Sequence, residues 1–488
     1  MVLETAFTFS KRVLPPQYYP HAAISGLALL VTYAFAQGRT TTRDRDLHAR
    51  TVLVTGAFTP LGLTLVTALA SRGAHVIAIS PYPLEHSQPT LLIPLLRSTT
   101  KNENIYAEYA DLCSPESIRA FCTKFLTEGD QRLDAIVFGH EYHGIGSLFD
   151  SKVSREQQRD AASLASFLIV TLLLPVLLVA PVERDIRIVT IINPFYAAAL
   201  PSFSNTLASA FATTESQQTT KPESVFLAEG RRALRTAVLT RHLQRVLDAL
   251  PNRGPSLDGS SNSKDAPNAH APPTKPRHSN IISVSVSPGI SRADTMAPLL
   301  HADRESTWSL RGFLIYFLLY PLLWLFTKSP IAALQSVLHA LFLPTPFKRA
   351  LAQVSAATDP SSSSESNKQG DIDDRLPEEV LKPGALYREC SVVTLGVPPL
   401  PSKFIEAMED AERKRKEKAG KKGKMEEDAF PLEDDGEFGG EMVGRTVWEW
   451  YEMKLKEWEA REKANKAVEK ESKDTAQLAE SSKPSTTS

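Results

Sequence analysis

The stretch that decides the fold is residues 51–62 of a 488-residue chain, which read Thr51-Val52-Leu53-Val54-Thr55-Gly56-Ala57-Phe58-Thr59-Pro60-Leu61-Gly62. Its first five residues are apolar or β-branched, as in a strand that is buried on both faces. Gly56 ends this run, and a helical pattern opens near Leu61. A buried strand, a glycine turn and a helix in this order begin a strand–helix unit, and the following sequence repeats that unit.

Five more short apolar runs alternate with helical patterns. They are Ala74–Ser80, Ile105–Ala110, Leu133–Phe138, Arg187–Asn193 and Ile281–Val286. Short buried strands that alternate with helices are typical of a parallel sheet covered by helices on both faces. The sequence therefore predicts an α/β fold with a doubly wound, mainly parallel sheet of the Rossmann type.

The helix predicted from Ala161 to Ala180 contains the apolar run FLIVTLLLPVLLVA, which hydropathy alone would assign to a membrane. This helix lies between two strands predicted for the same sheet, and parallel neighbours need a right-handed crossover at this position. We therefore interpret it as a buried crossover helix.

The glycine turn of residues 55–62 stands where a dinucleotide-binding fold places its phosphate-binding turn. It resembles the Thr-Gly-x-x-x-Gly-x-Gly turn of the short-chain dehydrogenase/reductase superfamily, with Pro60 in place of the middle glycine. Proline removes a backbone N–H and adds a ring beside the expected pyrophosphate. The resemblance spans roughly residues 50–400, and the pattern is also similar to an uncharacterised group of fungal proteins with this fold.

Further matches to this superfamily follow in order along the chain. Asp111-Leu112 resembles the adenine-contacting position, His140–Gly144 stands where the family has Asn-Asn-Ala-Gly, and Pro288-Gly289 matches the turn near the nicotinamide. Two later segments look like elements of membrane-bound, retinol-dehydrogenase-like members, namely Thr327–Pro330 and Leu386–Cys390.

The resemblance implies NAD or NADP as a cofactor. The residues expected to contact it are Thr55, Gly56, Gly62, Asp111, Leu112, Pro288 and Gly289. Ser80 ends the second predicted strand, where an acidic residue would favour NAD and a basic one NADP, so the sequence indicates neither.

The catalytic pattern of the family is absent. Its reaction uses a Tyr-x-x-x-Lys pair, in which the lysine lowers the tyrosine pKa from about 10 so that the phenol can exchange a proton. No tyrosine in this chain has lysine four positions later. The tyrosine position falls on Leu227 or Glu229, and the lysine position on Arg231 or Ala233.

The two supporting positions have changed as well, since the family's serine falls on Asn193 and its asparagine on Ser163. Asn193 retains an amide that can hydrogen-bond a carbonyl, and Glu229 with Arg231 is a candidate acid–base pair. The alternative, which we favour, is that these are ordinary polar residues at a site that has lost its function, because members of a cooperating catalytic set act together.

Composition excludes other kinds of site. The three cysteines (Cys113, Cys122 and Cys390) have no histidine neighbours at zinc-ligand spacing, so no metal site is expected. The 55 basic and 56 acidic residues give a net charge of −1, and no nucleic-acid partner is expected.

The N-terminus predicts a membrane anchor at residues 21–37, preceded by the short segment 1–20. The run HAAISGLALLVTYAFAQ is nearly uncharged, and Arg39, Arg43, Arg45 and Arg50 follow it. Arginines directly after a span favour a cytosolic domain, whereas a cleaved signal peptide is the alternative. An uncleaved anchor with the domain facing the cytosol is our interpretation, with the endoplasmic reticulum, lipid droplet or mitochondrial outer membrane as candidate locations.

A second apolar segment, Gly312–Phe326, reads GFLIYFLLYPLLWLF and is too short to cross a bilayer comfortably. It is either a buried lid helix over the substrate site or a helix in contact with lipid, and its aromatic residues suit an interface. A lipid contact would imply a lipophilic small molecule as ligand.

The Rossmann-type domain is predicted at residues 50–400. Residues 251–279 and 359–374 are rich in Pro, Ser and charge and are expected to be disordered insertions. A charged linker at 401–446 leads to an amphipathic helix at 447–470 and a disordered tail at 471–488. Trp448, Tyr451, Leu455 and Trp458 share one stripe of that helix, which must dock on the domain itself or on a protein partner.

The sequence thus predicts a membrane-anchored, catalytically degenerate protein that acts as a nucleotide- or lipophile-binding or scaffold module. The alternative is an active NAD(P)-dependent oxidoreductase that acts on a lipophilic alcohol or ketone with non-standard residues. A tether whose charged tail recruits partners is compatible with the first hypothesis.

Overall fold

The structure is a computed structural model that describes residues 18–127, 132–148, 152–181, 184–211, 224–250, 279–303, 309–346, 379–420, 432 and 434–481. Its centre is an eight-stranded sheet in the order β3-β2-β1-β4-β5-β6-β7-β8. The strands are β1 (Thr51–Thr55), β2 (His75–Ser80), β3 (Ile105–Tyr109), β4 (Ala135–Phe138), β5 (Ile186–Ile191), β6 (Ile281–Ser287), β7 (Leu386–Arg388) and β8 (Ser391–Val393).

The strand order confirms the predicted doubly wound sheet. All neighbouring pairs are parallel except β7 and β8, which form an antiparallel hairpin at one edge. The order reverses between β1 and β4, and a fold of this kind binds its ligand outside the carboxyl ends of the strands at that point. Every residue of β1, β4, β5 and β6 is buried, which explains their continuous apolar runs.

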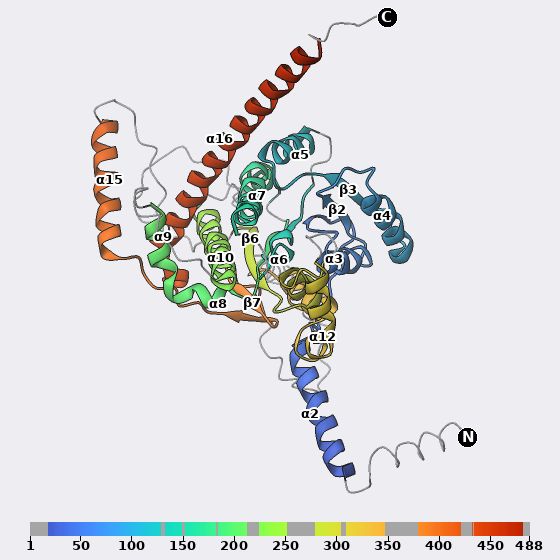
Figure 1. Cartoon of the computed structure of the whole chain (residues 1–488). Coiled ribbons are helices and arrows are strands. Elements are labelled where there is room, and N and C mark those ends of the chain that lie inside the picture. The colour runs from blue at the N-terminus through green and yellow to red at the C-terminus, as the bar shows by residue number, and fades with distance from the viewer. Residues whose placement is uncertain are drawn as a thin grey trace, which may run out of the picture.

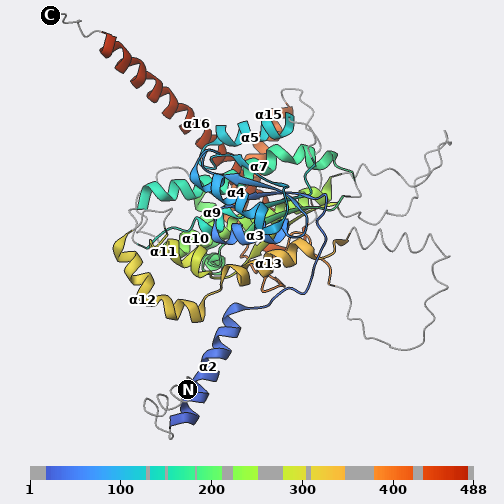
Figure 2. The ribbon, with the colours of Figure 1, turned by 90° about the vertical axis from the view of Figure 1, so that its right-hand side faces the viewer.

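Helices cover both faces of the sheet (Figures 1 and 2). One core contains α3 (Pro60–Ala70), α4 (Ser87–Thr100) and α13 (Pro330–Phe342), and the other contains α5 (Pro115–Thr127), α7 (Lys152–Val179) and α10 (Val225–Ala249). α7 connects the parallel neighbours β4 and β5, and Ala165, Leu168 and Leu173 on it are fully buried. The apolar helix at this position is therefore a crossover helix, as predicted.

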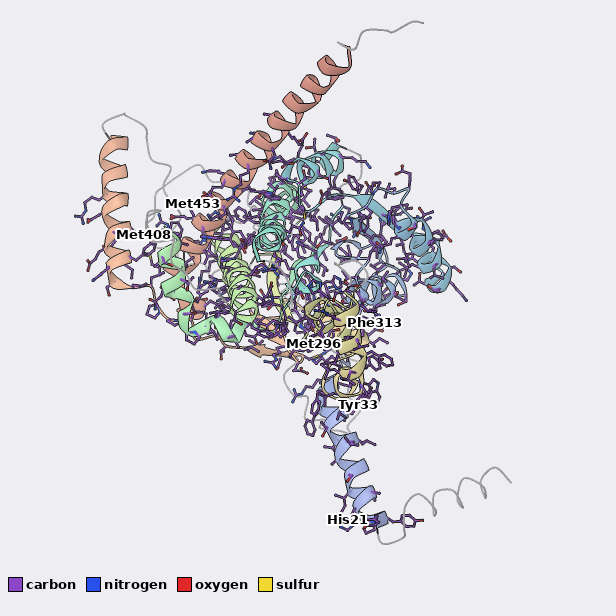
Figure 3. The ribbon with its side chains drawn as sticks, in the orientation of Figure 1. His21, Tyr33, Met296, Phe313, Met408 and Met453 are labelled. Atoms are coloured by element: carbon purple, nitrogen blue, oxygen red, sulfur yellow. The ribbon has the colours of Figure 1, made fainter. Side chains whose placement is uncertain are left out.

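Two apolar helices project from the domain together. α2 (Tyr19–Gln37) has no buried residue, and α12 (Leu310–Phe326) buries only Gly312 and Leu323. In Figures 1 and 2 both helices lie at the same end of the molecule. Figure 3 shows Tyr33 of α2 beside α12, and the Tyr33 ring stacks on that of Trp324 with 4.4 Å between the centroids.

The C-terminal part of the chain is more helical than predicted. Within the segment predicted as a charged linker lie α15 (Ser402–Gly420) and the short helix η6 (Glu437–Gly439). α16 (Gly440–Ser481) contains the predicted amphipathic helix and continues into the first residues of the segment predicted as a tail. Its first half packs against α7 and α10 of the same chain (Figure 1), so the aromatic stripe docks on the domain.

Several predicted segments lie outside the described residues. These are the N-terminal residues 1–17, the insertion at 251–279 except for Ser279, the whole insertion at 359–374, and residues 482–488 of the tail.

Candidate functional site

The glycine turn has the backbone geometry that its sequence requires. Gly56 has a φ of 67°, and a Cβ at this position would lie 2.7 Å from the backbone nitrogen of His140. A Cβ on Gly62 would lie 2.0 Å from the carbonyl oxygen of Gly56. Only glycine fits at both positions, so β1, the turn and α3 pack as closely as in a dinucleotide-binding fold.

The amino end of α3, however, has its hydrogen bonds satisfied by the chain itself. Pro60 has no N–H, and the N–H of Gly62 donates to the Thr59 hydroxyl at 3.1 Å. The N–H of Leu61 donates to the carboxylate of Asp294 at 2.9 Å. Asp294 is fully buried and belongs to η4 (Arg292–Met296), which follows β6. These residues do not fit a pyrophosphate, because the amides that would bind it already have acceptors.

The other residues predicted to contact a cofactor are engaged locally. Asp111 follows β3, and its carboxylate accepts the N–H of Cys113 at 2.9 Å, while Leu112 packs against the core. Pro288 and Gly289 follow β6 at the expected place and are buried. Ser80 donates its hydroxyl to the carbonyl of Tyr82 at 2.7 Å.

The segment after β4 is hydrogen-bonded to the loop after β6 and to the glycine turn. The phenol of Tyr142 in α6 (His140–His143) donates to the carbonyl of Gly289 at 2.8 Å, which joins the loops that follow β4 and β6. His140 lies beside the turn, with its Nδ1 2.7 Å from the Thr55 hydroxyl and its Nε2 2.9 Å from the carbonyl of Ala162. Burial lowers the pKa of His140, so its ring is neutral at pH 7.

His143 is held between two carboxylates. Its Nε2 lies 2.9 Å from an oxygen of Asp303, and its Nδ1 lies 3.8 Å from an oxygen of Asp294. Burial alone would lower the pKa of His143, but the hydrogen bonds and charges of the two aspartates raise it to about 9. His143, whose side chain is 15% exposed, is therefore a cation at neutral pH beside these two carboxylates.

Glu229 occupies the part of α10 where the sequence comparison places the catalytic tyrosine. Its carboxylate accepts the N–H of Gly146 at 3.1 Å and forms ion pairs with Arg159, at 2.7 Å, and with Arg232. The side chain is 1% exposed, and that of Arg232 is 3% exposed. The carboxylate is thus fixed among two cations and a backbone donor.

The four catalytic candidates fall at two places. The Asn193 side-chain amide donates to the Glu229 carbonyl at 3.2 Å, so these two lie together. Arg231 is half-buried two residues further along α10, and Glu229 pairs with Arg159 and Arg232. Ser163 lies in a separate buried cluster, where its hydroxyl is 2.7 Å from that of Tyr451 on α16.

Two buried tyrosines approach the cleft region, but their environments keep them protonated. Burial, followed by the nearby charge of Glu141, raises the pKa of Tyr451 to about 12. Burial and the charge of Asp294 raise the pKa of Tyr142 well above its ordinary value. A proton-transferring tyrosine needs the opposite shift, toward neutral pH. The pKa shifts of both phenols run opposite to this requirement.

Sequence reasoning missed four residues that define the site: Arg159, Arg232, Asp294 and Tyr451. Asp294 follows the Pro288-Gly289 turn closely, so its position after β6 was a usable signal. Arg159 and Tyr451 come from α7 and α16, and no motif linked them to the glycine turn.

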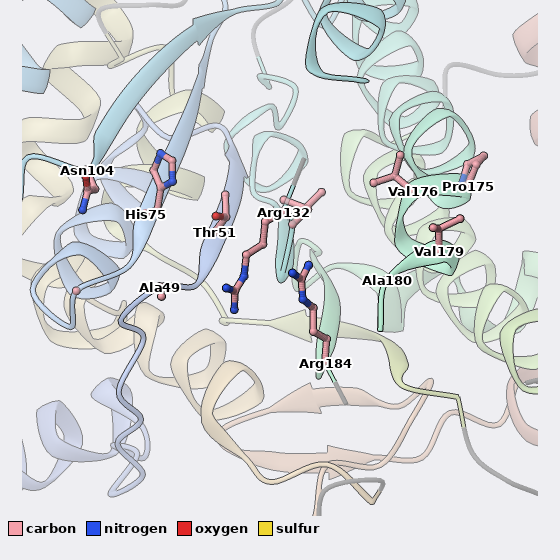
Figure 4. A pocket seen from close by; sticks show the side chains of 12 residues that line it. Ala49, Thr51, His75, Asn104, Arg132, Pro175, Val176, Val179, Ala180 and Arg184 are labelled. Atoms are coloured by element: carbon pink, nitrogen blue, oxygen red, sulfur yellow. The ribbon is translucent and has the colours of Figure 1, made fainter. Parts of the chain in front are cut away.

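A separate cavity of about 970 Å³ opens at the amino ends of the central strands (Figure 4). It is lined by residues at the amino ends of β1 and β4 and at the carboxyl end of α7, among them Thr51, Arg132 and Val179. The glycine turn lies at the carboxyl end of β1, so this cavity is not the nucleotide cleft.

No model of a known protein family matches the chain. Among curated proteins, it is 27% identical over 335 residues to the uncharacterized oxidoreductase pbr1 of Schizosaccharomyces pombe, covering 67% of this chain and 78% of that protein. It is also 27% identical over 320 residues to an uncharacterized oxidoreductase of Saccharomyces cerevisiae, covering 64% of this chain and 72% of that protein. Retinol dehydrogenase 13 of Mus musculus matches at 32% identity over 126 residues, which is 26% of this chain and 36% of that protein.

Among solved structures, a short-chain dehydrogenase from Sphingobium yanoikuyae in complex with NADPH aligns with 14% identity and a TM-score of 0.38, over 66% of this chain and 98% of that one. A short-chain dehydrogenase from Salmonella enterica aligns with 15% identity and a TM-score of 0.37, over 59% of this chain and 97% of that one. The doubly wound strand order and the glycine turn are those of a Rossmann-type fold, and the curated relatives to which the chain is similar are named as oxidoreductases and a retinol dehydrogenase.

Proposed function

We propose that this chain is a membrane-anchored member of the superfamily that has lost the standard proton-transfer chemistry and serves as a lipophile-binding or scaffold module. The observation that carries the proposal is the environment of Glu229. At one of the two helical positions that correspond to the catalytic tyrosine, a carboxylate is paired with Arg159 and Arg232 and accepts a hydrogen bond from the Gly146 amide.

This arrangement opposes both steps of acid–base catalysis. One oxygen of the Glu229 carboxylate already accepts from the Gly146 amide and pairs with Arg159, and the other pairs with Arg232, so both oxygens that would exchange a proton with a substrate have partners within the chain. Moving it toward a substrate would leave Arg232 buried and unpaired, which costs about 3–5 kcal/mol. Asn193 is directed at the backbone of Glu229 and donates there, so its amide is engaged as well.

The membrane part of the proposal rests on α2 and α12. α2 is apolar and has no buried residue over its 19 residues, and Arg39 and Arg43 follow it, which favours a cytosolic domain. The end of α2 is fastened to the domain, because Gln37 hydrogen-bonds both the Thr327 carbonyl and the Ser329 hydroxyl. These contacts favour an uncleaved anchor, because cleavage before Gln37 would separate α2 from the domain that its last residue contacts.

α12 supports a second contact with lipid. It has 17 residues, so its length of about 25 Å falls short of a hydrocarbon core of about 30 Å. Phe317 and Leu318 are 71% and 77% exposed, which is costly in water and favourable in a bilayer. The helix lies against α2 through Tyr33 and Trp324, and this contact supports a position of α12 close to the point where the proposed anchor would enter a membrane. A ligand reaching the domain from this side would be lipophilic.

The second candidate is an active NAD(P)-dependent oxidoreductase. The names of the two fungal relatives favour it, together with the retained glycines of the turn. It would need Glu229 and Asn193 to act in place of the phenol and the serine hydroxyl.

Turnover assays separate the two candidates. The full-length protein in lipid nanodiscs is incubated with NADH or NADPH and panels of retinoid, steroid and acyl ketones, and with NAD or NADP and the matching alcohols. We expect no turnover above that of a heat-denatured sample. Robust turnover that is abolished by Glu229→Gln or Asn193→Ala, but retained in Asp160→Asn at an exposed pair with Arg235, would establish the oxidoreductase.

A further inference from the structure

We infer that the carboxylate of Asp294 occupies the place where the doubly wound fold holds the phosphates of a dinucleotide, so that this chain closes its own nucleotide turn. The inference concerns cofactor binding and not proton transfer. A failure of this inference would therefore leave the proposed loss of proton transfer untouched. Equally, the inference would still hold if the chain proved to catalyse a reaction that needs no dinucleotide.

The first support is the chemistry of the contact. The amino end of a helix binds anions because its first amides lack partners and carry partial positive charge. At the amino end of α3, the Leu61 amide has no acceptor within the helix or its cap. It donates instead to an oxygen of Asp294 at 2.9 Å. A carboxylate and a phosphate present the same kind of acceptor, an anionic oxygen. Asp294 therefore gives the turn the anion that a cofactor would bring.

The second support is that Asp294 is fixed from its other side. Its second oxygen accepts the hydroxyl of Ser291 at 3.0 Å, and His143 contributes a cation at 3.8 Å. The side chain is completely buried. An exposed aspartate could swing away from an incoming phosphate, but this one would leave the Leu61 amide and the Ser291 hydroxyl without their acceptor.

The third support is a second contact across the same cleft. The Tyr142 phenol reaches the carbonyl of Gly289 at 2.8 Å, three residues before η4 begins. The loop after β6 is thus joined to α3 through Asp294 and to α6 through Tyr142. A dinucleotide that entered here would have to break both contacts and place its phosphates beside a buried carboxylate, where like charges repel.

The test compares the full-length wild-type protein with Asp294→Ala in nanodiscs. Thermal melting is measured without ligand, with 1 mM NADPH and with 1 mM inorganic pyrophosphate. We expect the wild-type midpoint to stay unchanged and that of Asp294→Ala to rise by about 3 °C or more with NADPH, as binding well above Kd would produce. Asp294→Asn, which keeps the size and one acceptor oxygen but removes the charge, should show a smaller rise.

Hydrogen exchange supplies a second readout. The Leu61 amide should exchange faster in Asp294→Ala than in the wild type, and pyrophosphate should restore its protection only in the variant. The matched control is Asp303→Asn, which removes the other carboxylate on His143 and leaves the Leu61 contact in place. It should gain no binding.

Two results would overturn the inference. One is a wild-type protein that NADPH stabilises as much as it does Asp294→Ala. The other is a pair of Asp294 variants that melt cooperatively yet gain neither ligand stabilisation nor pyrophosphate protection of Leu61.

Discussion

A carboxylate buried among guanidinium groups is stable only when every charge has a partner, because each ion loses its hydration. Glu229 meets this condition through Arg159, Arg232 and the Gly146 amide, and Asp294 meets it through His143, Ser291 and the Leu61 amide. At the scale of single residues, the two carboxylates are therefore held in an internal network of charges and hydrogen bonds.

This network predicts a pH dependence that His143 controls. The pKa of His143 is about 9 in the folded chain, against about 6.5 for an unperturbed histidine. Between these values the folded state holds a proton that the unfolded state has released, so the stabilisation is complete below about pH 6.5 and is lost as the pH rises through 9. Urea unfolding should therefore show a difference between wild type and His143→Gln that shrinks steadily from pH 6.5 to pH 9.5.

The control for this measurement is Leu91→Gln, which replaces an exposed side chain that carries no titratable group. Its difference from the wild type should stay constant over the same range. A constant difference for His143→Gln as well would contradict a raised pKa for that ring.

At the scale of elements, α16 completes the core that α7 and α10 begin. Trp450 is 5% exposed, and the Arg235 guanidinium of α10 lies 4.0 Å from the centre of its ring. Tyr451 inserts its hydroxyl between Ser163 and Thr236, at 2.7 and 3.3 Å. The helix is therefore part of the domain and not an appendage to it.

Replacing Trp450 by alanine should accordingly destabilise the whole domain. Removing a large buried aromatic side chain costs about 3–5 kcal/mol, whereas Lys463→Ala on an exposed face of the same helix should cost under about 0.5 kcal/mol. Denaturant unfolding followed by near-ultraviolet circular dichroism measures the free energy of unfolding of both variants. Equal midpoints for the two variants would show that α16 is not needed for the core.

The elements themselves were predictable, because short apolar runs and helical periodicity are local properties. The six strands predicted from apolar runs are all present as β1 to β6. Their ends differ from the predicted ones by at most two residues. The docking site of α16 was not predictable, since an aromatic stripe requires a partner but does not specify it. The same holds for the contact of Asp294 with Leu61, which joins residues 233 positions apart. The changed catalytic positions were visible in the sequence, but the arginines that now hold Glu229 were not.

At the scale of the whole molecule, α2 and α12 should anchor the domain independently. A chain lacking residues 1–36 should still float with phosphatidylcholine vesicles through α12. Replacing both Phe317 and Leu318 by glutamate in that shortened chain should abolish flotation, because each buried charge costs about 2.5–3.5 kcal/mol in a bilayer. The same pair of substitutions in the full chain should leave it membrane-bound through α2.

Leu91→Glu provides the control, since this leucine is 69% exposed on α4, outside the proposed lipid contact. It should not change flotation of the shortened chain. A shortened chain that stays in the soluble fraction before any further substitution would remove α12 from the proposed membrane contact.

The position of α16 in the chain has a consequence for biosynthesis. The sheet begins at Thr51, yet the helix that covers α7 and α10 begins only at Gly440. The ribosome makes α16 well after α7 and α10. A nascent chain must therefore expose the apolar surfaces of α7 and α10 until translation is nearly finished. Premature termination before this helix would leave that surface uncovered, and such fragments should be substrates for chaperones and degradation.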